Sequence, residues 1–180
     1  GPVIAVTGSN GKTTTKDMLA HVLSAKLKTV KARGSYNNLV GVPLTLLEIE
    51  RDTQAVVLEM EANTPGGITR LCDIARPGIG VITNIGDTHL ESLGSREGVL
   101  QEKAELIQDL PAEGTMVLNT DDPGVNALQD LCANRARTTF GVRNDAEFRA
   151  SCIEISDTSL TFTVNGRHRV SLQTGFRENV

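Results

Sequence analysis

Residues 6–19 read VTGSNGKTTTKDML and combine glycines, a lysine and a run of threonines directly after an apolar segment. Glycines let backbone N–H groups curl around an anion, and a helix that follows adds the positive end of its dipole. In such a loop Lys12 would neutralise phosphate charge, and the Thr13 hydroxyl would reach a magnesium ion. The other cofactor-binding residues predicted in this loop are Thr7, Gly8, Ser9, Asn10, Gly11 and Thr14.

The loop is shorter than the usual phosphate-binding loop. The usual motif, GxxxxGKS or GxxxxGKT, would have its first glycine at residue 6, which is Val6 here. A glycine-rich turn that only caps a helix is the alternative. The apolar segment before the loop and its GKT core favour a nucleotide site.

A carboxylate and an imidazole follow two other apolar segments. Glu59 lies near the end of AVVLEM, residues 55–60, where a buried carboxylate is costly unless it is paired or binds a metal. We expect a magnesium ligand, with a salt bridge to a lysine or arginine as the alternative. His89 lies in NIGDTHLESLG, residues 84–94, and a lone loop histidine is as often an ordinary surface residue as a ligand.

Lys103 interrupts the apolar face of a predicted helix in SREGVLQEKAELIQDL, residues 95–110. It follows Val99 by four residues and precedes Leu106 by three, so it lies on the buried side. Burial lowers the pKa of a lysine, and the neutral amine is then available as a nucleophile that carbon dioxide can carbamylate. The alternative is a side chain whose stem is buried and whose ammonium reaches water.

These residues are placed by a predicted α/β fold. Short apolar strands are expected at 2–7, 55–60, 78–83 and 114–119, with helices at 12–26 and from about residues 65, 95 and 123. This alternation indicates a doubly wound, mainly parallel sheet, in which ligands bind beyond the carboxyl ends of the strands. We therefore expect the loop, the carboxylate and the imidazole to share one edge.

The pattern changes at about residue 145. The segments EFRASCIEI, SLTFTV and HRVSL alternate apolar with polar residues, and Asn165-Gly166 is a strong hairpin signal. We therefore expect a P-loop α/β core over about residues 1–144 and a small antiparallel sheet over about 145–176.

Composition excludes several classes of protein. The 180 residues carry a formal net charge of −4 with both signs intermixed, which argues against a nucleic-acid partner. No apolar run has the length of a membrane span, and the three separated cysteines argue against a disulfide framework or a zinc site. We expect a soluble cytoplasmic domain. The abrupt ends, Gly1-Pro2 and Asn179-Val180, suggest a domain excised from a longer chain.

Taken together, these motifs resemble the central, ATP-binding domain of the Mur ligases, the cytoplasmic enzymes that form amide bonds in peptidoglycan precursor synthesis. TGSNGKTTT is the short phosphate loop of that family, which accounts for Val6. The other segments that carry the resemblance are GSYNNLVGVPLTLLEI (34–49), EMEANTPGGI (59–68), VITNIGDTHLESLGS (81–95), EKAEL (102–106) and LNTDDP (118–123).

The resemblance implies a role for each matched position. Lys12 and the loop backbone would hold the ATP phosphates, while Thr13 and Glu59 would bind one magnesium ion. A second ion would be bound by His89 and by a carbamate on Lys103. Asn37 and Asn38 would face the UDP-muramoyl peptide, Asn84 would bind the cofactor beside the metals, and Asn179 would bind it near the adenine. The catalytic residues are thus predicted to be Lys12, His89 and Lys103.

Three positions depart from the family pattern. Glu61 stands where the family usually has glycine, Gly67 where it usually has glutamate, and Glu178 near the usual histidine.

The family's chemistry implies that ATP phosphorylates a carboxylate and that an amine attacks the acyl phosphate, with two magnesium ions neutralising charge. NNLVGVPLTLL, residues 37–47, favours members that join D-Ala-D-Ala to UDP-MurNAc-tripeptide. We expect a monomer whose flanking UDP-sugar and C-terminal domains lie outside this segment. The alternatives are another Mur or folylpolyglutamate-type ligase, a GTPase switch, which would need the NKxD motif that is absent here, and a non-catalytic nucleotide-binding module.

Overall fold

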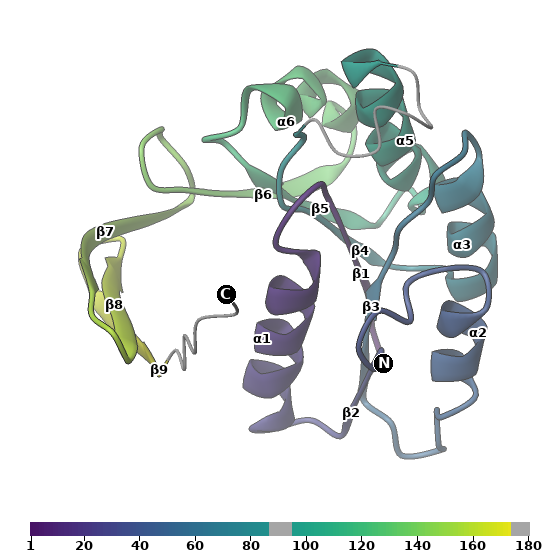
Figure 1. Ribbon diagram of the computed structural model, residues 1–180, viewed down its shortest axis with the longest axis horizontal. Coiled ribbons are helices and arrows are strands. Elements are labelled where there is room, and N and C mark those ends of the chain that lie inside the picture. Colours follow the sequence, from purple (N-terminus) through teal and green to yellow (C-terminus); the bar gives the residue numbers. More distant parts are fainter. Residues whose placement is uncertain (87–94, 174–180) are drawn as a thin grey trace.

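The computed structural model describes residues 1–86 and 95–173. Within these residues a nine-stranded sheet has the order β2-β3-β1-β4-β5-β6-β7-β8-β9 (Figure 1). The strands are β1 (Val3–Thr7), β2 (Thr29–Lys31), β3 (Ala55–Glu59), β4 (Ile79–Ile82), β5 (Thr115–Asn119), β6 (Ala136–Gly141), β7 (Phe148–Ile155), β8 (Ser159–Val164) and β9 (His168–Gln173). The helices are α1 (Lys12–Ser24), α2 (Gly41–Leu46), α3 (Gly67–Ala75), α5 (Arg96–Asp109), α6 (Pro123–Ala127) and the 3₁₀ turn η1 (Gln129–Cys132).

The first six strands are parallel, which confirms the predicted doubly wound sheet. β1 lies between β3 and β4. After β1 the chain forms β2 and β3 on one side of β1, and it then crosses to the other side of β1 to form β4. Such a reversal of strand order opens a crevice at the carboxyl ends of the central strands. The glycine-rich loop after β1 lies at this crevice.

The C-terminal strands confirm the predicted antiparallel pairing, and β8 and β9 meet at a turn in which Asn165 and Gly166 both have positive φ, 51° and 65°. This sheet is nevertheless continuous with the main one. Phe140 pairs with Phe148 and Gly141 with Arg149, so β7 extends β6 in parallel through these two residue pairs. Figure 1 shows β7–β9 standing away from the helices that cover the core.

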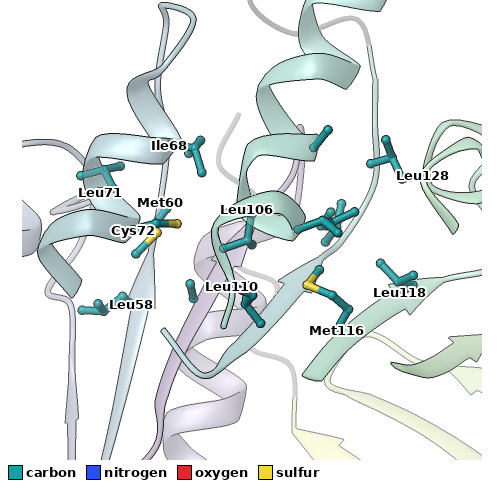
Figure 2. Packing of buried hydrophobic residues seen from close by; sticks show 14 of the residues in the cluster. Leu58, Met60, Ile68, Leu71, Cys72, Leu106, Leu110, Met116, Leu118 and Leu128 are labelled. Carbon is teal, nitrogen blue, oxygen red and sulfur yellow. The ribbon is translucent and has the colours of Figure 1, made fainter. Parts of the chain in front are cut away.

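The two faces of the main sheet are covered unequally. One face packs against α1 through Ala20 and buries residues from β1, β3 and β4, among them Val6, Val57 and Val81. The opposite face is covered by α2, α3, α5 and α6. Alternate residues of the strands point to it and form the larger core with Leu106 of α5 (Figure 2).

Some elements differ from the sequence prediction. β2, β6 and α2 were not predicted, because β2 has three residues, β6 has three polar residues at its centre, and α2 is a short helix that contains a proline. On α1, the helical spacing of the apolar residues favours burial of Met18 and Val22, but these are 42% and 67% exposed, whereas Lys16 and Ala20 are buried. The face of α1 that packs against the sheet is formed by Leu19, Ala20 and Leu23. Across the described segments no helix is both long and apolar enough to cross a bilayer.

Candidate functional site

Two glycines give the loop between β1 and α1 its shape. Gly8 has φ 140°, and a Cβ there would lie 2.0 Å from Oγ1 of Thr83, so only glycine lets the loop approach the end of β4. Gly11 has φ 78° and is the N-cap residue of α1. The loop therefore turns tightly into the N-terminus of α1, where free N–H groups and the helix dipole favour an anion.

The segment after β4 supports this loop. The side chain of Asn84 both accepts from the Asn10 backbone N–H (2.8 Å) and donates to the Asn10 carbonyl (2.9 Å). Thr83 Oγ1 donates to the same carbonyl at 2.7 Å, and the Ser9 hydroxyl accepts from the Gly86 N–H at 2.8 Å. Asn84, predicted to contact the cofactor, thus holds the phosphate loop in position, and its contact with a ligand stays a prediction.

A cation, a hydroxyl and a carboxylate meet beside the loop. The Thr13 hydroxyl donates to Oε2 of Glu59 at 2.8 Å. Lys12 Nζ lies at the first turn of α1 and donates to the Ser9 carbonyl at 3.2 Å. The structure thus brings together three of the predicted site residues, two from the start of α1 and one from the end of β3, because Glu59 is paired with Val6 of β1 in the sheet.

Asn37 connects this group to a second carboxylate. Its Nδ2 donates to Glu59 Oε1 at 2.9 Å and to Glu61 Oε2 at 2.8 Å, and its own carbonyl accepts from the Glu61 N–H. Glu61 Oε1 lies 2.9 Å from Lys12 Nζ. The sequence marked Glu61 only as a departure from the family pattern. Its ion pair with Lys12 follows from how β3 and α1 are placed.

Lys16 is fully buried one turn after Lys12 and donates to the Gly34 carbonyl at 2.9 Å. This bond ties α1 to the segment that carries Asn37. The sequence did not single out Lys16.

Lys103 is fully buried, as its place in the apolar stripe predicted, which excludes the alternative of an ammonium in water. Oε2 of Glu102, which is also buried, lies 2.6 Å from Lys103 Nζ. Burial lowers the pKa of Lys103 below its ordinary 10.5, an effect opposed by Glu102 and reinforced by Lys12. Burial likewise raises the pKa of Glu102 above 4.5, partly offset by Lys103.

Apart from this ion pair, Lys103 Nζ has no hydrogen bond within the residues that the structure describes. Buried polar atoms normally have such partners, and their absence points to a place for a ligand. The charges of Lys12 and Glu61 also influence the pKa of Lys103, Lys12 lowering it and Glu61 raising it.

Acidic residues of two matched motifs position neighbouring elements. Glu105 accepts from the N–H groups of Gly66 (2.6 Å) and Thr69 (3.0 Å), and so caps the N-terminus of α3 from α5. In LNTDDP, Asp122 caps α6 through the Val125 N–H, and its other oxygen accepts from the Ile85 N–H.

Two pockets adjoin at this edge of the sheet. The first, of about 360 Å³, is lined by the loop with Thr13 and Glu59. The second, of about 410 Å³, lies between the Asn38 segment and the start of α3, with Arg70 in its wall. Asn37 and Glu61 line both pockets. A nucleotide phosphate in the first pocket would therefore lie next to a ligand in the second.

The other predicted residues have separate outcomes. Asn38 lines the second pocket, and its side chain also accepts from the N–H groups of Val40 and Gly41 at the start of α2. His89 and Asn179, predicted to lie beside a metal and the adenine, and the departure at Glu178 all lie outside the described residues.

Comparison with known proteins decides the family. A model described as the Mur ligase middle domain matches residues 6–177. The chain belongs to this Mur ligase family.

Named Mur ligases are similar to this domain over most of its length. The UDP-N-acetylmuramoyl-tripeptide--D-alanyl-D-alanine ligase of Mycobacterium tuberculosis is 48% identical over 133 residues, covering 74% of this chain and 26% of that enzyme. A crystal structure of MurF from Acinetobacter baumannii has a TM-score of 0.88 at 32% identity, covering 97% of this chain and 38% of that chain. MurF from Thermotoga maritima, solved in complex with ADP, has a TM-score of 0.84 at 32% identity, covering 96% and 40%. The chain thus spans well under half the length of each.

One departure from the Mur ligase pattern has a local steric reason. Gly67 begins α3, and a Cβ there would lie 2.3 Å from the Cβ of Ala62. In this Mur ligase domain the close approach of α3 to the segment after β3 therefore requires glycine at position 67.

Proposed function

We propose that this chain is the ATP- and magnesium-binding middle domain of a longer enzyme that joins D-Ala-D-Ala to UDP-MurNAc-tripeptide. ATP would phosphorylate the terminal carboxylate of the tripeptide, and the amine of D-Ala-D-Ala would displace phosphate from the acyl phosphate, leaving ADP and the new amide. The named relatives support this reaction. Because the chain covers 26% of the M. tuberculosis relative, the complete activity belongs to the longer protein.

The observation that carries this proposal is the group formed by Lys12, Thr13 and Glu59. A hydroxyl and a carboxylate at 2.8 Å offer the oxygen ligands that Mg²⁺ prefers, and the Lys12 ammonium lies beside them at the start of α1. These residues fit one magnesium ion together with nucleotide phosphates. When bound, the ion would neutralise charge on the transferred phosphoryl group.

The loop backbone, Lys12 and Lys103 would each have a separate role in binding the nucleotide and the metals. The loop backbone would hold the phosphates through its N–H groups, in the shape set by Gly8 and supported by Asn84. Lys12 would neutralise phosphate charge directly. The buried Lys103, as a carbamate, would join His89 in holding a second magnesium ion. The unsatisfied hydrogen-bonding capacity around Lys103 supports this part of the proposal.

The 410 Å³ pocket is the proposed place for the reacting end of the muramoyl peptide. It adjoins the loop pocket, and Asn37 and Asn38 line it. We further propose the division into a core of about residues 1–144 and a sheet of about 145–176, a cytoplasmic location, a monomeric state and a site for adenine near Asn179.

The test is the release of phosphate by the intact protein in the presence of ATP, Mg²⁺ and UDP-MurNAc-tripeptide. Phosphate release that requires D-Ala-D-Ala would support the ligase. ATP turnover indifferent to every amino acid and dipeptide would exclude it. Lys12→Ala should abolish turnover, whereas Lys28→Ala, at an exposed lysine paired with Glu50, should leave it unchanged.

The carbamate on Lys103 has its own test. Lys103→Ala should abolish ligation, and a short carboxylic acid added to the buffer should partly restore it by supplying the missing carboxylate. Wild-type rates in this variant would exclude the carbamate while leaving the rest of the proposed function intact.

A further inference from the structure

Glu61 lies at the junction of the two pockets, two residues beyond the proposed metal ligand Glu59. It lines both the 360 Å³ loop pocket and the 410 Å³ pocket beside it. In the proposed reaction a phosphoryl group would pass between these pockets. A carboxylate at the junction therefore lies where additional negative charge must be accommodated.

At this junction Glu61 forms an ion pair with Lys12. Its Oε1 lies 2.9 Å from the Lys12 ammonium, whose side chain is only 9% exposed. That ammonium also donates to the Ser9 carbonyl. A phosphate oxygen that approached Lys12 would meet a carboxylate oxygen already in place. A charge-assisted bond in a sheltered pocket is strong enough for this competition to affect affinity.

Glu59 differs from Glu61 in its partners, although both are carboxylates in the same pocket. The two oxygens of Glu59 accept from the Thr13 hydroxyl and from Asn37. One oxygen of Glu61 also accepts from Asn37, but the other pairs with Lys12. Glu59 is thus placed to bind a cation, whereas Glu61 neutralises a cation of the protein itself.

We propose that Glu61 is an internal counter-ion that competes with the terminal phosphates of ATP for Lys12. ATP binds only when the Glu61 side chain leaves Lys12, and the 410 Å³ pocket that it also lines is the space into which it moves. Glu61 therefore lowers the affinity for ATP and makes occupancy of the nucleotide site depend on the neighbouring pocket. This inference rests on the proposed function, which assigns Lys12 to the phosphates.

The experiment measures ATP binding by calorimetry to the intact protein, first in EDTA and then in Mg²⁺. Glu61→Gln keeps the size of the side chain and removes its charge, and Glu61→Ala removes the contact altogether. Both should bind ATP about tenfold more tightly than the wild type in EDTA, because Lys12 is released for phosphate. Thermal unfolding of each variant shows whether it is folded.

Two matched variants separate competition from simple repulsion. Glu59→Gln removes a carboxylate from the same pocket without releasing Lys12, so it should tighten binding less in EDTA and lose the effect of Mg²⁺. Glu50→Gln also removes one negative charge, but Glu50 precedes β3 and lies toward the end of that strand remote from the loop. This variant should leave the affinity for ATP unchanged.

The outcomes are distinguishable. If the wild type binds ATP and both Glu61 variants bind equally or more weakly, the competition is excluded and the nucleotide site stands. Equal tightening in Glu59→Gln and Glu61→Gln would also overturn it, as would a loss of the Mg²⁺ effect in Glu61→Gln, which would make Glu61 a metal ligand. If neither the wild type nor any of the variants binds ATP, the proposed function fails together with the inference.

Discussion

Asn37 is the residue on which the arrangement of the two carboxylates depends. Its side-chain amide donates to both Glu59 and Glu61 and separates charges that would otherwise repel. Partners of metal ligands commonly set the orientation of those ligands. Asn37 therefore acts on the proposed metal ligand as well as facing the second pocket.

Asn37→Asp should destabilise the chain in a metal-dependent way. The substitution replaces the amide that donates to Glu59 and Glu61 by a third carboxylate at a buried position. We therefore expect the free energy of unfolding in EDTA to fall by about 2 kcal/mol. Added Mg²⁺ should restore part of that stability by binding the folded state. Urea unfolding with and without Mg²⁺ measures both effects.

The matched control is Asn38→Asp. Its Oδ1 only accepts hydrogen bonds, from Val40 and Gly41, and a carboxylate retains that ability. Stability should be close to that of the wild type. Equal losses in both variants would show that Asn37 has no special part in separating the carboxylates.

The buried Lys103–Glu102 pair predicts a dependence on pH. Lys103→Met leaves the Glu102 carboxylate without its cation, which costs about 3 to 5 kcal/mol when that group is charged. Burial already raises the pKa of Glu102 above 4.5. An acid whose pKa is higher in the folded than in the unfolded state loses stability as pH rises between the two values. The deficit of this variant should therefore grow from about pH 4.5 upward.

Urea unfolding at pH 5 and pH 8 measures this deficit. The double variant Glu102→Gln with Lys103→Met removes both charges and should recover most of the stability at pH 8. A deficit that is the same at both pH values would attribute the loss to packing alone.

At the scale of elements, the helices are joined by side chains from distant parts of the chain. The N-cap residue of α3 is Gly66, which has no side chain to accept a hydrogen bond. Glu105 of α5 supplies that acceptor across the helix pair and adds a negative charge at the positive end of α3. The start of α3 also forms part of the wall of the 410 Å³ pocket.

Glu105→Ala should therefore destabilise the domain by about 1 to 2 kcal/mol, because two partly buried N–H groups lose their acceptor. Glu105→Gln keeps one acceptor and should lose less. Chemical denaturation gives the loss, and hydrogen exchange should show faster exchange at Gly66 and Thr69. Protection unchanged at these two amides in Glu105→Ala would contradict the capping role.

At the scale of the whole molecule, the C-terminal sheet is held to the core by few interactions. β7 joins β6 through two residue pairs. Beside this junction the Asp121 carboxylate accepts from the N–H groups of Val142, Arg143 and Asn144. Burial acts to raise the pKa of Asp121, but these donors outweigh it and hold the pKa below 3.8. The Asp121 carboxylate is thus charged at neutral pH and accepts these hydrogen bonds.

Asp121→Ala should loosen the C-terminal sheet while the core stays folded. Hydrogen exchange should become faster in β7, β8 and β9 and remain slow in β1, β3 and β4. An acid whose pKa is depressed by folding loses its stabilising effect as pH falls through that value. The exchange rates of the wild type in β7, β8 and β9 should therefore approach those of the variant only at strongly acid pH. Faster exchange throughout the core would show that the two parts unfold together.

The sequence alone predicted the alternation of strands and helices, gave the burial of Lys103 as one of two alternatives, and led to the chemistry that we propose for the loop. Each of these follows from local spacing: GKT after an apolar strand, apolar runs of strand length, and a lysine within a helical stripe. It did not find β2 or β6, whose short or polar sequences are indistinguishable from loops until neighbouring strands pair with them.

The polar groups that face one another could be identified only in the folded chain. Glu61 reaches Lys12, Asn37 reaches Glu59, and Glu105 reaches the start of α3, across separations along the chain that no periodicity encodes. Their proximity depends on the order β3-β1-β4 and on the rotation of α1 and α5 against the sheet. That arrangement minimises the exposure of apolar surface over the whole domain, so it is a property of the packed chain rather than of any one segment.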